Sequence, residues 1–494
     1  MITLKRNVEI GVVGAGLVGS LLSIFLARRG FRVDVFERRP DMRTENISAG
    51  RSINLAVSTR GIRALKKAGL DEQILQLAVP MRGRMIHGLD GQLNLLPYGK
   101  NDSEYINSIS RAALNKMLMS EAQKSGTVDI HFNQKCLGMD VEKGILSFHN
   151  EQDNQYTDVV SNIVLGTDGS ASAIRHDMCK LPQYTCHEST LNYGYKELEI
   201  SAGPTGQFKM EKNALHIWPR GTYMLIALPN SDGSYTCTLF LPWEGEISFE
   251  KLKTPADVRK FFEQHFADAA PLIDDLEETF FANPTGQMVT VKCQPWNLDE
   301  RVLLLGDAAH AIVPFFGQGM NAGFEDLTIL DDCIEQHMKQ GGPLYVNRRD
   351  GETMTDVHSR RMQEGSTGWL HVFEDFVSRR KIDTDAIADM AVENFVEMRD
   401  KVADPKFQLE KAVEKILQNT FSGQYISRYS LVTFTNVPYS FAMKVGIVND
   451  ELLAQLCKDI GAAEQVDLIL ARKLIKTKIQ PLLAEHEAEL VVSA

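Results

Sequence analysis

The chain has 494 residues and a formal net charge of −12, and 44% of its residues are hydrophobic and 24% are charged. That length can bury a large core, and the ordinary composition excludes a chain that is disordered throughout. The acidic balance disfavours nucleic acid as a partner. Because the sequence has no run of about 18 uncharged apolar residues, we expect no integral membrane span.

The first predicted elements are a buried strand over Val8–Val13, a tight turn, and a helix that is established by Ser20. The turn has the spacing Gly14-x-Gly16-x-x-Gly19. Gly14 permits the turn, Gly16 lets the backbone approach a pyrophosphate, and Gly19 lets the helix pack close to the strand. Such turns also serve purely for packing, but between a strand and a helix this one predicts a dinucleotide site.

A second predicted strand, residues 32–36, ends at Glu37. A carboxylate at this distance from the glycine turn can accept hydrogen bonds from a ribose 2′-hydroxyl, which favours FAD or NAD over NADP. The turn opens the chain and no second copy follows a later strand, which is typical of FAD held as a prosthetic group. We therefore predict an FAD site that includes Glu37 and the three glycines.

Two later strands each lead into a glycine–aspartate pair. Residues 162–166 precede Asp168-Gly169, and residues 301–305 precede Gly306-Asp307. The first pair can also be an ordinary type I turn. The side chain of Asp307 is suited to accept a hydrogen bond from a ribityl hydroxyl of FAD.

A helix is expected to open near Gly319, after the stretch Pro314-Phe315-Phe316-Gly317. Its first N–H groups, at Met320 and Asn321, would point at the pyrimidine edge of the flavin. That edge becomes anionic on reduction, and the positive end of the helix dipole favours an anion there.

The glycine turn at Gly14, the pair at Asp168 and the pair at Gly306 occur in the order and spacing of the class A FAD-dependent aromatic hydroxylases, and the chain resembles that family. In that family the segment matching Asp168 lies near FAD and the route of the pyridine nucleotide, and the segment matching Gly306 and Asp307 contacts FAD. Arg111 matches an FAD-contacting arginine, although a surface ion pair is the plain alternative. No second dinucleotide turn is present, so we expect NADPH to bind transiently as a co-substrate.

Further segments narrow the resemblance to the kynurenine 3-monooxygenase family. They are Arg51–Ala56, Met81–Met85, Pro97–Gly99, Gly194–Leu198, Asn213–Pro219, Asn394–Met398 and Arg428–Phe434. Together they cover almost the whole chain. The resemblance implies that NADPH and O2 are consumed as L-kynurenine becomes 3-hydroxy-L-kynurenine, with oxygen delivered from a flavin hydroperoxide. The aniline nitrogen activates the ring itself, so no catalytic side chain is nominated.

The resemblance places the amino-acid carboxylate of the substrate on Arg84 and Tyr98. A guanidinium fork and a phenol both donate to a carboxylate, which agrees with that role. Arg82 is the alternative if the register differs. The same resemblance assigns Asn394 and Tyr429 to the polar end of the substrate. It sets Phe240, Phe315 and Met398 against the aromatic ring, where core packing is the competing explanation for each aromatic side chain.

We predict an α/β fold with a discontinuous Rossmann-like FAD-binding domain, a mixed β-sheet substrate domain and a C-terminal helical region. The FAD-binding domain comprises 1–80, 100–180 and 290–340, the substrate domain 81–99 and 181–289, and the helical region 341–494. Alternating runs over 223–228 and 235–241 predict a hairpin in the substrate sheet.

The seven cysteines show no metal-ligand spacing, so we expect reduced thiols in a cytoplasmic enzyme and no metal. We also expect a monomer or a homodimer. The basic pairs at 348–349, 360–361 and 379–380 are interpreted as a solvated helix face. Residues 468–483 are expected to form a partly buried helix rather than a membrane-surface one. Phe316 stands where the family resemblance leads us to expect a polar residue.

Two other functions remain open from the sequence. One is a related flavin hydroxylase that acts on another aromatic acid. The other is a non-catalytic flavin-fold protein that binds a partner. A third alternative, a flavin enzyme that acts on lipids at a membrane, is disfavoured because it requires a hydrophobic anchor and the sequence shows no strong one.

Overall fold

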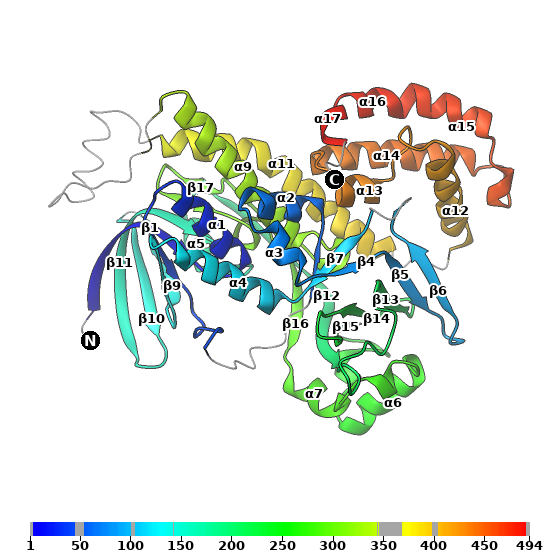
Figure 1. The fold of residues 1–494 in the computed structure, drawn as a ribbon, viewed down its shortest axis with the longest axis horizontal. Coiled ribbons are helices and arrows are strands. Elements are labelled where there is room, and N and C mark those ends of the chain that lie inside the picture. The colour runs from blue at the N-terminus through cyan, green and yellow to red at the C-terminus, as the bar shows by residue number, and fades with distance from the viewer. Residues whose placement is uncertain are drawn as a thin grey trace.

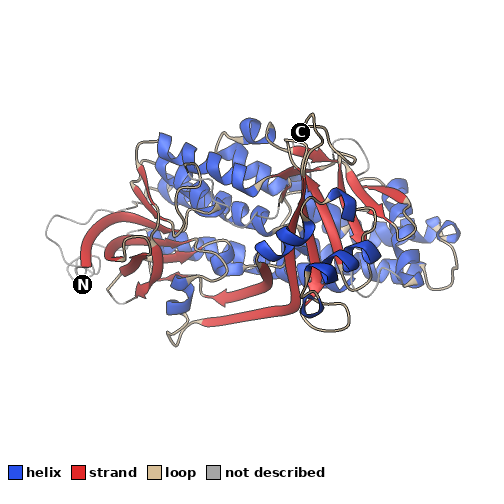
Figure 2. Cartoon of the chain, turned by 90° about the horizontal axis from the view of Figure 1, so that it is seen from below, coloured by secondary structure: helices blue, strands red, loops and turns tan. Residues whose placement is uncertain are grey.

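The structure, a computed structural model, describes residues 3–44, 54–99, 104–141, 143–342, 344, 368–397 and 404–490. Two large sheets and one small sheet are covered by helices, and a group of helices at the C-terminal end packs beside them (Figure 1). Seen from below, the strands of the two large sheets gather in separate groups (Figure 2). The α/β class with a mixed second sheet is therefore confirmed.

The first large sheet is built around β1 (Thr3–Val13), which pairs in parallel with β2 (Val33–Phe36) and β11 (Gln155–Gly166). Apolar residues such as Ile10 and Val12 are fully buried, as expected for a parallel strand covered on both faces. β11 also pairs in parallel with β18 (Val302–Leu304), so the predicted strands occur in one sheet. The other strands are β8 (Val128–His131), β9 (Lys135–Asp140), β10 (Ile145–Asn150) and β17 (Asn297–Leu298).

Helices α1 (Leu17–Arg28), α4 (Arg111–Lys124) and α9 (Gly319–Lys339) pack together over this sheet. Their apolar side chains and those of the sheet form one continuous core. α9 also packs against α2 (Thr59–Lys67) and α11 (Trp369–Val396). The smaller helices of this part are α3 (Asp71–Leu75), α5 (Ala173–Met178) and α8 (Asp307–His310).

The second large sheet has the order β16-β12-β15-β14-β13-β5-β6. Its pairs are antiparallel except that β5 (Gly83–His87) runs parallel to β13 (Ala214–Pro219). The predicted hairpin is confirmed by β14 (Met224–Pro229) and β15 (Tyr235–Pro242). β6 is Leu93–Pro97, β12 is Thr185–Ile200 and β16 is Thr285–Gln294, and α6 (Pro255–His265) and α7 (Leu276–Ala282) cover one face.

A small sheet of β3 (Leu55–Val57), β7 (Ile106–Ile109) and β4 (Val79–Met81) completes the strands. β3 and β4 each pair with β7 in antiparallel fashion. Pro229, at the end of β14, accepts a hydrogen bond from Asn54, next to β3. The small sheet therefore contacts the second large sheet.

The C-terminal helices form their own core around α14 (Tyr439–Leu456). The segment 468–483 folds as α15 (Leu468–Leu474), a π-helix (Ile475–Ile479) and α16 (Gln480–Ala484). It buries a stripe one turn apart, Ala471, Ile475, Ile479 and Leu483, which confirms a partly buried helix. Among the described residues, no helix is long and apolar enough to cross a membrane. The remaining helices are α12 (Pro405–Thr420), α13 (Arg428–Phe434) and α17 (Glu487–Leu490).

Two expectations from the sequence were wrong. Cys179 and Cys186 form a disulfide with their Cα atoms 6.0 Å apart, because the end of α5 turns back toward β12. Arg380 does not lie on a solvated face, since it is 2% exposed and faces two acids of α9. Its neighbour Arg379 is partly exposed and pairs with Asp375 one turn earlier, as a surface charge does. The pairs at 348–349 and 360–361 lie outside the described residues.

Candidate flavin and substrate site

The glycine turn after β1 has the form that a dinucleotide site requires. Gly14 has φ +100°, and a Cβ there would stand 2.7 Å from the carbonyl oxygen of Thr167. A Cβ on Gly19 would collide with the carbonyl oxygen of Gly14, so the helix needs glycine to pack this close. By contrast, nothing lies within 4 Å of the Cβ position on Gly16. This open side is where a pyrophosphate can approach the backbone.

Glu37 is 5% exposed and supports the same turn. Its Oε2 accepts the N–H of Ala15 at 2.9 Å, and its Oε1 accepts the N–H and Nε–H of Arg39 at 2.9 and 2.8 Å. Burial opposes ionisation of Glu37, but these donors outweigh it and lower the pKa below its usual value. The carboxylate is therefore charged and fixed beside the glycine turn. Arg39 Nη2 also donates to Oε2 at 3.3 Å, so about four lone-pair sites are in use and a ribose hydroxyl would replace one of the Arg39 contacts.

Asp168 follows β11 and lies directly behind the glycine turn, with its Cα 3.1 Å from the Cβ position on Gly14. Its Oδ2 accepts the N–H of Ala173 at 2.7 Å. Its Oδ1 is buried and has no hydrogen-bond partner among the described residues. Burial also raises the pKa of the carboxyl. A buried oxygen without a partner is costly, so a donor from a bound ligand fits this position.

Gly306 and Asp307 sit where β18 ends, facing the first turn of α1. Gly306 has φ +59°, and a Cβ there would stand 3.0 Å from Val18 Cγ2. Between residues 302 and 311, Asp307 is the exposed residue in a run of buried ones. An isolated exposed carboxylate next to the glycine turn suits a contact with a ribityl hydroxyl.

α9 begins at Gly319, as the sequence predicts. The side chain of Asn321 is fully buried and is used within the protein. Its Oδ1 accepts the N–H of Ser58 at 2.9 Å, and its Nδ2 donates to the carbonyl oxygen of Ala56 at 2.8 Å. Any flavin contact at Asn321 therefore falls to its backbone, while the side chain of Met320 is partly buried.

Arg111 is the exposed first residue of α4, whose N-cap Ser110 accepts the N–H of Ala113 at 3.3 Å. Its charge reaches Tyr195 on β12, as does that of Asp307. Burial is the main reason that the pKa of Tyr195 is raised, followed by the charge of Glu197. Tyr195 thus places the second sheet near the predicted flavin residues Arg111 and Asp307. Nothing in the local sequence pattern selects Tyr195 beyond its place in a family segment.

The predicted carboxylate site is brought together from three elements. Arg84 lies on β5, Tyr98 directly follows β6, and Tyr429 lies on α13. The Arg84 guanidinium carbon is 5.0 Å from the centroid of the Tyr98 ring and 4.7 Å from that of the Tyr429 ring. The two rings are nearly parallel at 5.9 Å. Burial and the nearby Tyr429 raise the pKa of Tyr98, so its phenol remains a donor.

A cluster of packed aromatic side chains, which we call the aromatic chamber, adjoins the clamp formed by Arg84, Tyr98 and Tyr429. Phe240 of β15 and Phe315 have ring centroids 5.2 Å apart, and Phe315 lies 4.5 Å from Phe395 of α11. Asn394 donates from Nδ2 to the carbonyl oxygen of Phe315 at 2.7 Å, which ties α11 to this loop. Phe395 was not predicted as a site residue. It follows Asn394 in α11, and the spacing of apolar residues along this helix does not distinguish it from an ordinary core residue. Met398 lies outside the described residues.

Phe316 joins the chamber to the clamp. Its ring is stacked at 5.9 Å on that of Tyr429, and the side chain packs against both the C-terminal core and the chamber. Here an aromatic residue stands where we expect a polar one. It therefore contributes apolar contact to the wall rather than a hydrogen bond.

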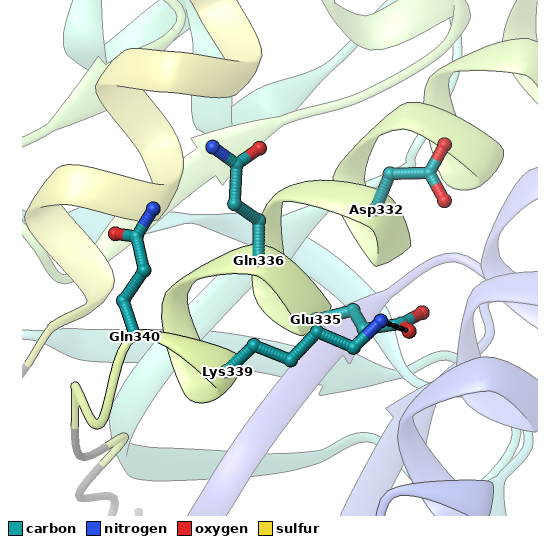
Figure 3. Close-up of a pocket in the computed structure, with 5 residues that line it drawn as sticks. All are labelled: Asp332, Glu335, Gln336, Lys339 and Gln340. Carbon is teal, nitrogen blue, oxygen red and sulfur yellow. Dashed lines mark ion pairs between the residues drawn. The ribbon is translucent and has the colours of Figure 1, made fainter.

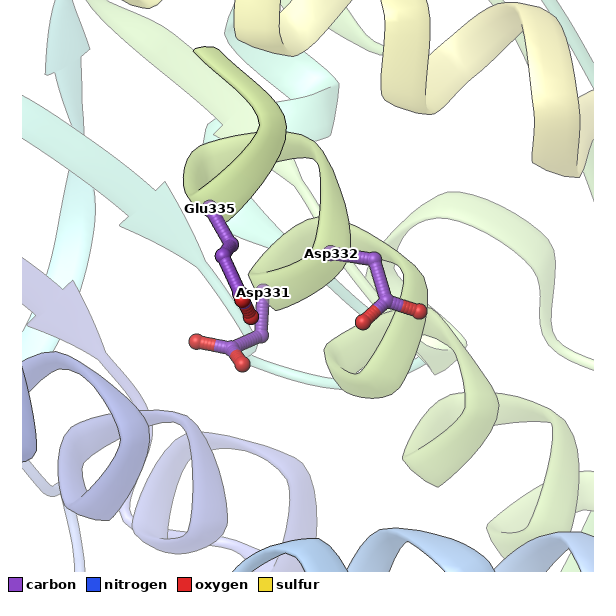
Figure 4. Close-up of side chains that lie close together, drawn as sticks. All are labelled: Asp331, Asp332 and Glu335. Carbon is purple, nitrogen blue, oxygen red and sulfur yellow. The ribbon is translucent and has the colours of Figure 1, made fainter. Parts of the chain in front are cut away.

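A surface depression on α9 lies apart from this site. It is lined by Asp332, Glu335, Gln336, Lys339 and Gln340 (Figure 3). The acids Asp331, Asp332 and Glu335 group on the same helix (Figure 4). Asp331 pairs with Arg29 at 2.5 Å and with Lys67 at 2.7 Å, and Lys67 also reaches Asp332. Protein cations already balance these carboxylates, so the group needs no metal ion.

The family model described as an FAD binding domain matches residues 7–344. A kynurenine 3-monooxygenase of Myxococcus xanthus (strain DK1622) is 52% identical over 481 residues, 97% of this chain and 97% of that protein. The kynurenine 3-monooxygenase of Dictyostelium discoideum is 43% identical over 95% of this chain and 98% of its own length.

Solved structures support the same fold. A p-nitrophenol 4-monooxygenase from Pseudomonas putida DLL-E4 has a TM-score of 0.60 at 17% identity, covering 91% of this chain and 98% of that one. A tetrameric 2-methyl-3-hydroxypyridine-5-carboxylic acid oxygenase has a TM-score of 0.59 at 17% identity, covering 82% of this chain and 95% of that one.

Proposed function

The chain belongs to the kynurenine 3-monooxygenase family of FAD-dependent hydroxylases, and from this premise we propose how its own residues perform the reaction. The enzyme hydroxylates L-kynurenine to 3-hydroxy-L-kynurenine with NADPH and O2. The observation that carries the residue assignment is the meeting of Arg84, Tyr98 and Tyr429 beside an aromatic chamber.

Arg84 holds the amino-acid carboxylate of kynurenine. Its guanidinium provides two parallel donors, and the rings of Tyr98 and Tyr429 both lie within 5.0 Å of it. Because Arg84 is partly buried, the attraction between its guanidinium and a bound carboxylate is stronger than that between the same two charges in water. Arg82 is exposed and its guanidinium lies 5.6 Å from the centroid of the Tyr105 ring, so it is the weaker candidate.

The aromatic ring of kynurenine lies along Phe240 and Phe315, with Phe316 and Phe395 completing the wall. These apolar side chains orient the ring and keep water away from the reacting carbon. Asn394 fixes the Phe315 backbone and so sets one wall of the chamber. Met398 is assigned to the same wall from the family resemblance alone.

FAD is held by Gly14, Gly16 and Gly19 at its pyrophosphate, by Glu37 at the adenosine ribose, and by Asp307 at the ribityl chain. The backbone of Gly306, Met320 and Asn321, with Arg111 and Asp168, completes the set. The open space at Gly16 and the unpartnered Oδ1 of Asp168 fit a bound dinucleotide. When FAD is bound and reduced by NADPH, it supplies the activated oxygen; the protein supplies position and a dry chamber.

The division into an FAD-binding domain (1–80, 100–180, 290–340), a substrate domain (81–99, 181–289) and a helical region (341–494) is part of the same proposal. Strand membership supports it, because the first sheet draws on 3–36, 128–166 and 297–304 and the second on 83–97 and 185–294. We place the enzyme in the cytoplasm as a monomer or homodimer.

The test is NADPH consumption by the purified, FAD-loaded protein with and without L-kynurenine, together with identification of the product. We expect strong stimulation and 3-hydroxykynurenine. Stimulation by an anthranilate or a hydroxybenzoate, with none by kynurenine, would overturn the substrate assignment. A colourless protein that binds no FAD would favour a non-catalytic scaffold.

A further inference from the structure

A buried network of ion pairs lies between the turn at Gly306 and Asp307, which we call the flavin turn, and the C-terminal helices. It is built from two consecutive acids of α9, Glu325 and Asp326, and two arginines, Arg60 of α2 and Arg380 of α11. Arg380 donates to Asp326 Oδ1 at 2.9 Å and to Glu325 Oε2 at 2.8 Å, and Arg60 donates to Glu325 Oε1 at 2.5 Å. Asp326 is 0% exposed. Removing one partner of such a network leaves an uncompensated charge, so each member is tightly constrained.

The flavin end of the network is the second oxygen of Asp326. Asp326 Oδ2 accepts the N–H of Gly306 at 3.0 Å and contacts Nε2 of His310 at 2.5 Å. Gly306 and His310 are the N-cap and the last residue of α8, and Asp307 lies between them. One buried carboxylate therefore fixes both ends of the short helix that presents Asp307.

The substrate end of the network is Arg60. Its Nη2 donates to the carbonyl oxygen of Val437 and its Nε to that of Val432 at 3.4 Å. Val432 lies on α13, the helix that carries Tyr429. The guanidinium also stacks 3.8 Å from the centroid of the Tyr439 ring. The Tyr439 hydroxyl donates to Gln318 Oε1 at 2.9 Å, at the N-cap of α9.

The arrangement does more than neutralise charge. Asp383 also lies 3.8 Å from Arg380, so the two arginines face three acids, and one oxygen of Asp326 is directed away from both arginines, at Gly306 and His310. Asp331 on the same helix shows the ordinary case, because it pairs with Arg29 and Lys67 and makes no such contact with the flavin turn.

We propose that Asp326 is a positioning residue of the hydroxylase, which fixes Asp307 for FAD and, through Glu325 and Arg60, joins it to the helix that carries Tyr429. The flavin environment then depends on whether kynurenine occupies the carboxylate site, and by linkage the dependence is reciprocal. This inference rests on the proposed function, because Tyr429 is taken to contact kynurenine.

The test compares Asp326→Asn with Asp331→Asn in otherwise unchanged protein. Asp326→Asn keeps the side-chain shape but removes its charge, and we expect the Kd of the apoprotein for FAD to rise by about tenfold or more. In the reloaded protein, the change that kynurenine causes in the visible flavin spectrum should fall by at least about half. Asp331→Asn should lower the melting temperature and leave both flavin readouts as in the wild type.

Tyr439→Phe keeps the ring beneath Arg60 and removes only the hydroxyl bond to Gln318, so it covers the case in which Asp326→Asn does not fold. It should reduce the kynurenine-induced spectral change without lowering FAD content. The inference is overturned if a folded Asp326→Asn, or Tyr439→Phe when the former does not fold, responds like the wild type. It is also overturned if the wild type hydroxylates kynurenine but shows no spectral response. A wild type that does not act on kynurenine refutes instead the proposed function.

Discussion

Replacing Arg84 by alanine removes the guanidinium beside the rings of Tyr98 and Tyr429, where it lies 5.0 and 4.7 Å from their centroids. The two phenols remain as donors, but the charge opposite the substrate carboxylate is lost. Truncating one partner of a buried, hydrogen-bonded charge pair costs about 2–5 kcal/mol. That corresponds to a loss of roughly 30-fold to several thousand-fold in affinity for kynurenine.

The assay is the KM for L-kynurenine and the FAD content of the same preparation. FAD content should be unchanged, because Arg84 lies on the second sheet and none of the flavin residues contacts it through a described hydrogen bond. Arg82→Ala is the matched control: it is exposed and two residues away, and its KM should stay within about threefold, as for a surface substitution.

A second comparison isolates the carboxylate itself. The decarboxylated analogue of kynurenine lacks the group that Arg84 is assigned to hold, so Arg84→Ala should weaken its binding far less than that of kynurenine. An unchanged KM for kynurenine in Arg84→Ala, or equal losses for kynurenine and the analogue, would refute the clamp.

Three other predictions follow from the same geometry. Asp307→Ala should purify with little FAD, seen as a loss of yellow absorbance, because the exposed carboxylate beside Gly306 is gone; full occupancy contradicts its ribityl role. Tyr98→Phe should weaken kynurenine binding by roughly tenfold or more, because it removes a hydrogen bond to a charged group. Unchanged binding would argue against a donor role for the Tyr98 hydroxyl. The exposed carboxylate of Asp268 accepts hydrogen bonds from His87 at 2.6 Å and Trp218 at 2.9 Å, and these donors outweigh a partial desolvation and lower its pKa. Its contribution to stability is therefore present above the unfolded pKa of about 3.9 and is lost as pH falls through the folded value. The stability gap between wild type and Asp268→Asn, from urea unfolding at several pH values, should shrink with acidification, and a constant gap would contradict this.

The features that local sequence patterns predict are those that depend on backbone geometry. Gly14 and Gly19 have no room for a Cβ, and this follows from a strand that turns directly into a helix. The start of α9 at Gly319 and the hairpin of β14 and β15 were also visible, because proline, glycine and alternating apolar residues mark them.

The features that the sequence could not predict depend on contacts between distant segments. Arg380 looks like half of a surface basic pair, and only the packing of α11 on α9 brings it to Glu325 and Asp326. Cys179 and Cys186 carry no recognisable spacing, and they meet because α5 turns back toward β12. Tyr195 is one of several aromatic residues in a strand, and only the sheet places it near Asp307 and Arg111.

The most direct measurement is a crystal structure of the FAD-loaded enzyme with L-kynurenine bound. The predicted result has the substrate carboxylate within hydrogen-bond distance of Arg84 and of a tyrosine hydroxyl, with the aniline ring between Phe240 or Phe315 and the flavin. Electron density that puts the carboxylate on Arg82, or the ring outside the aromatic chamber, would contradict the account.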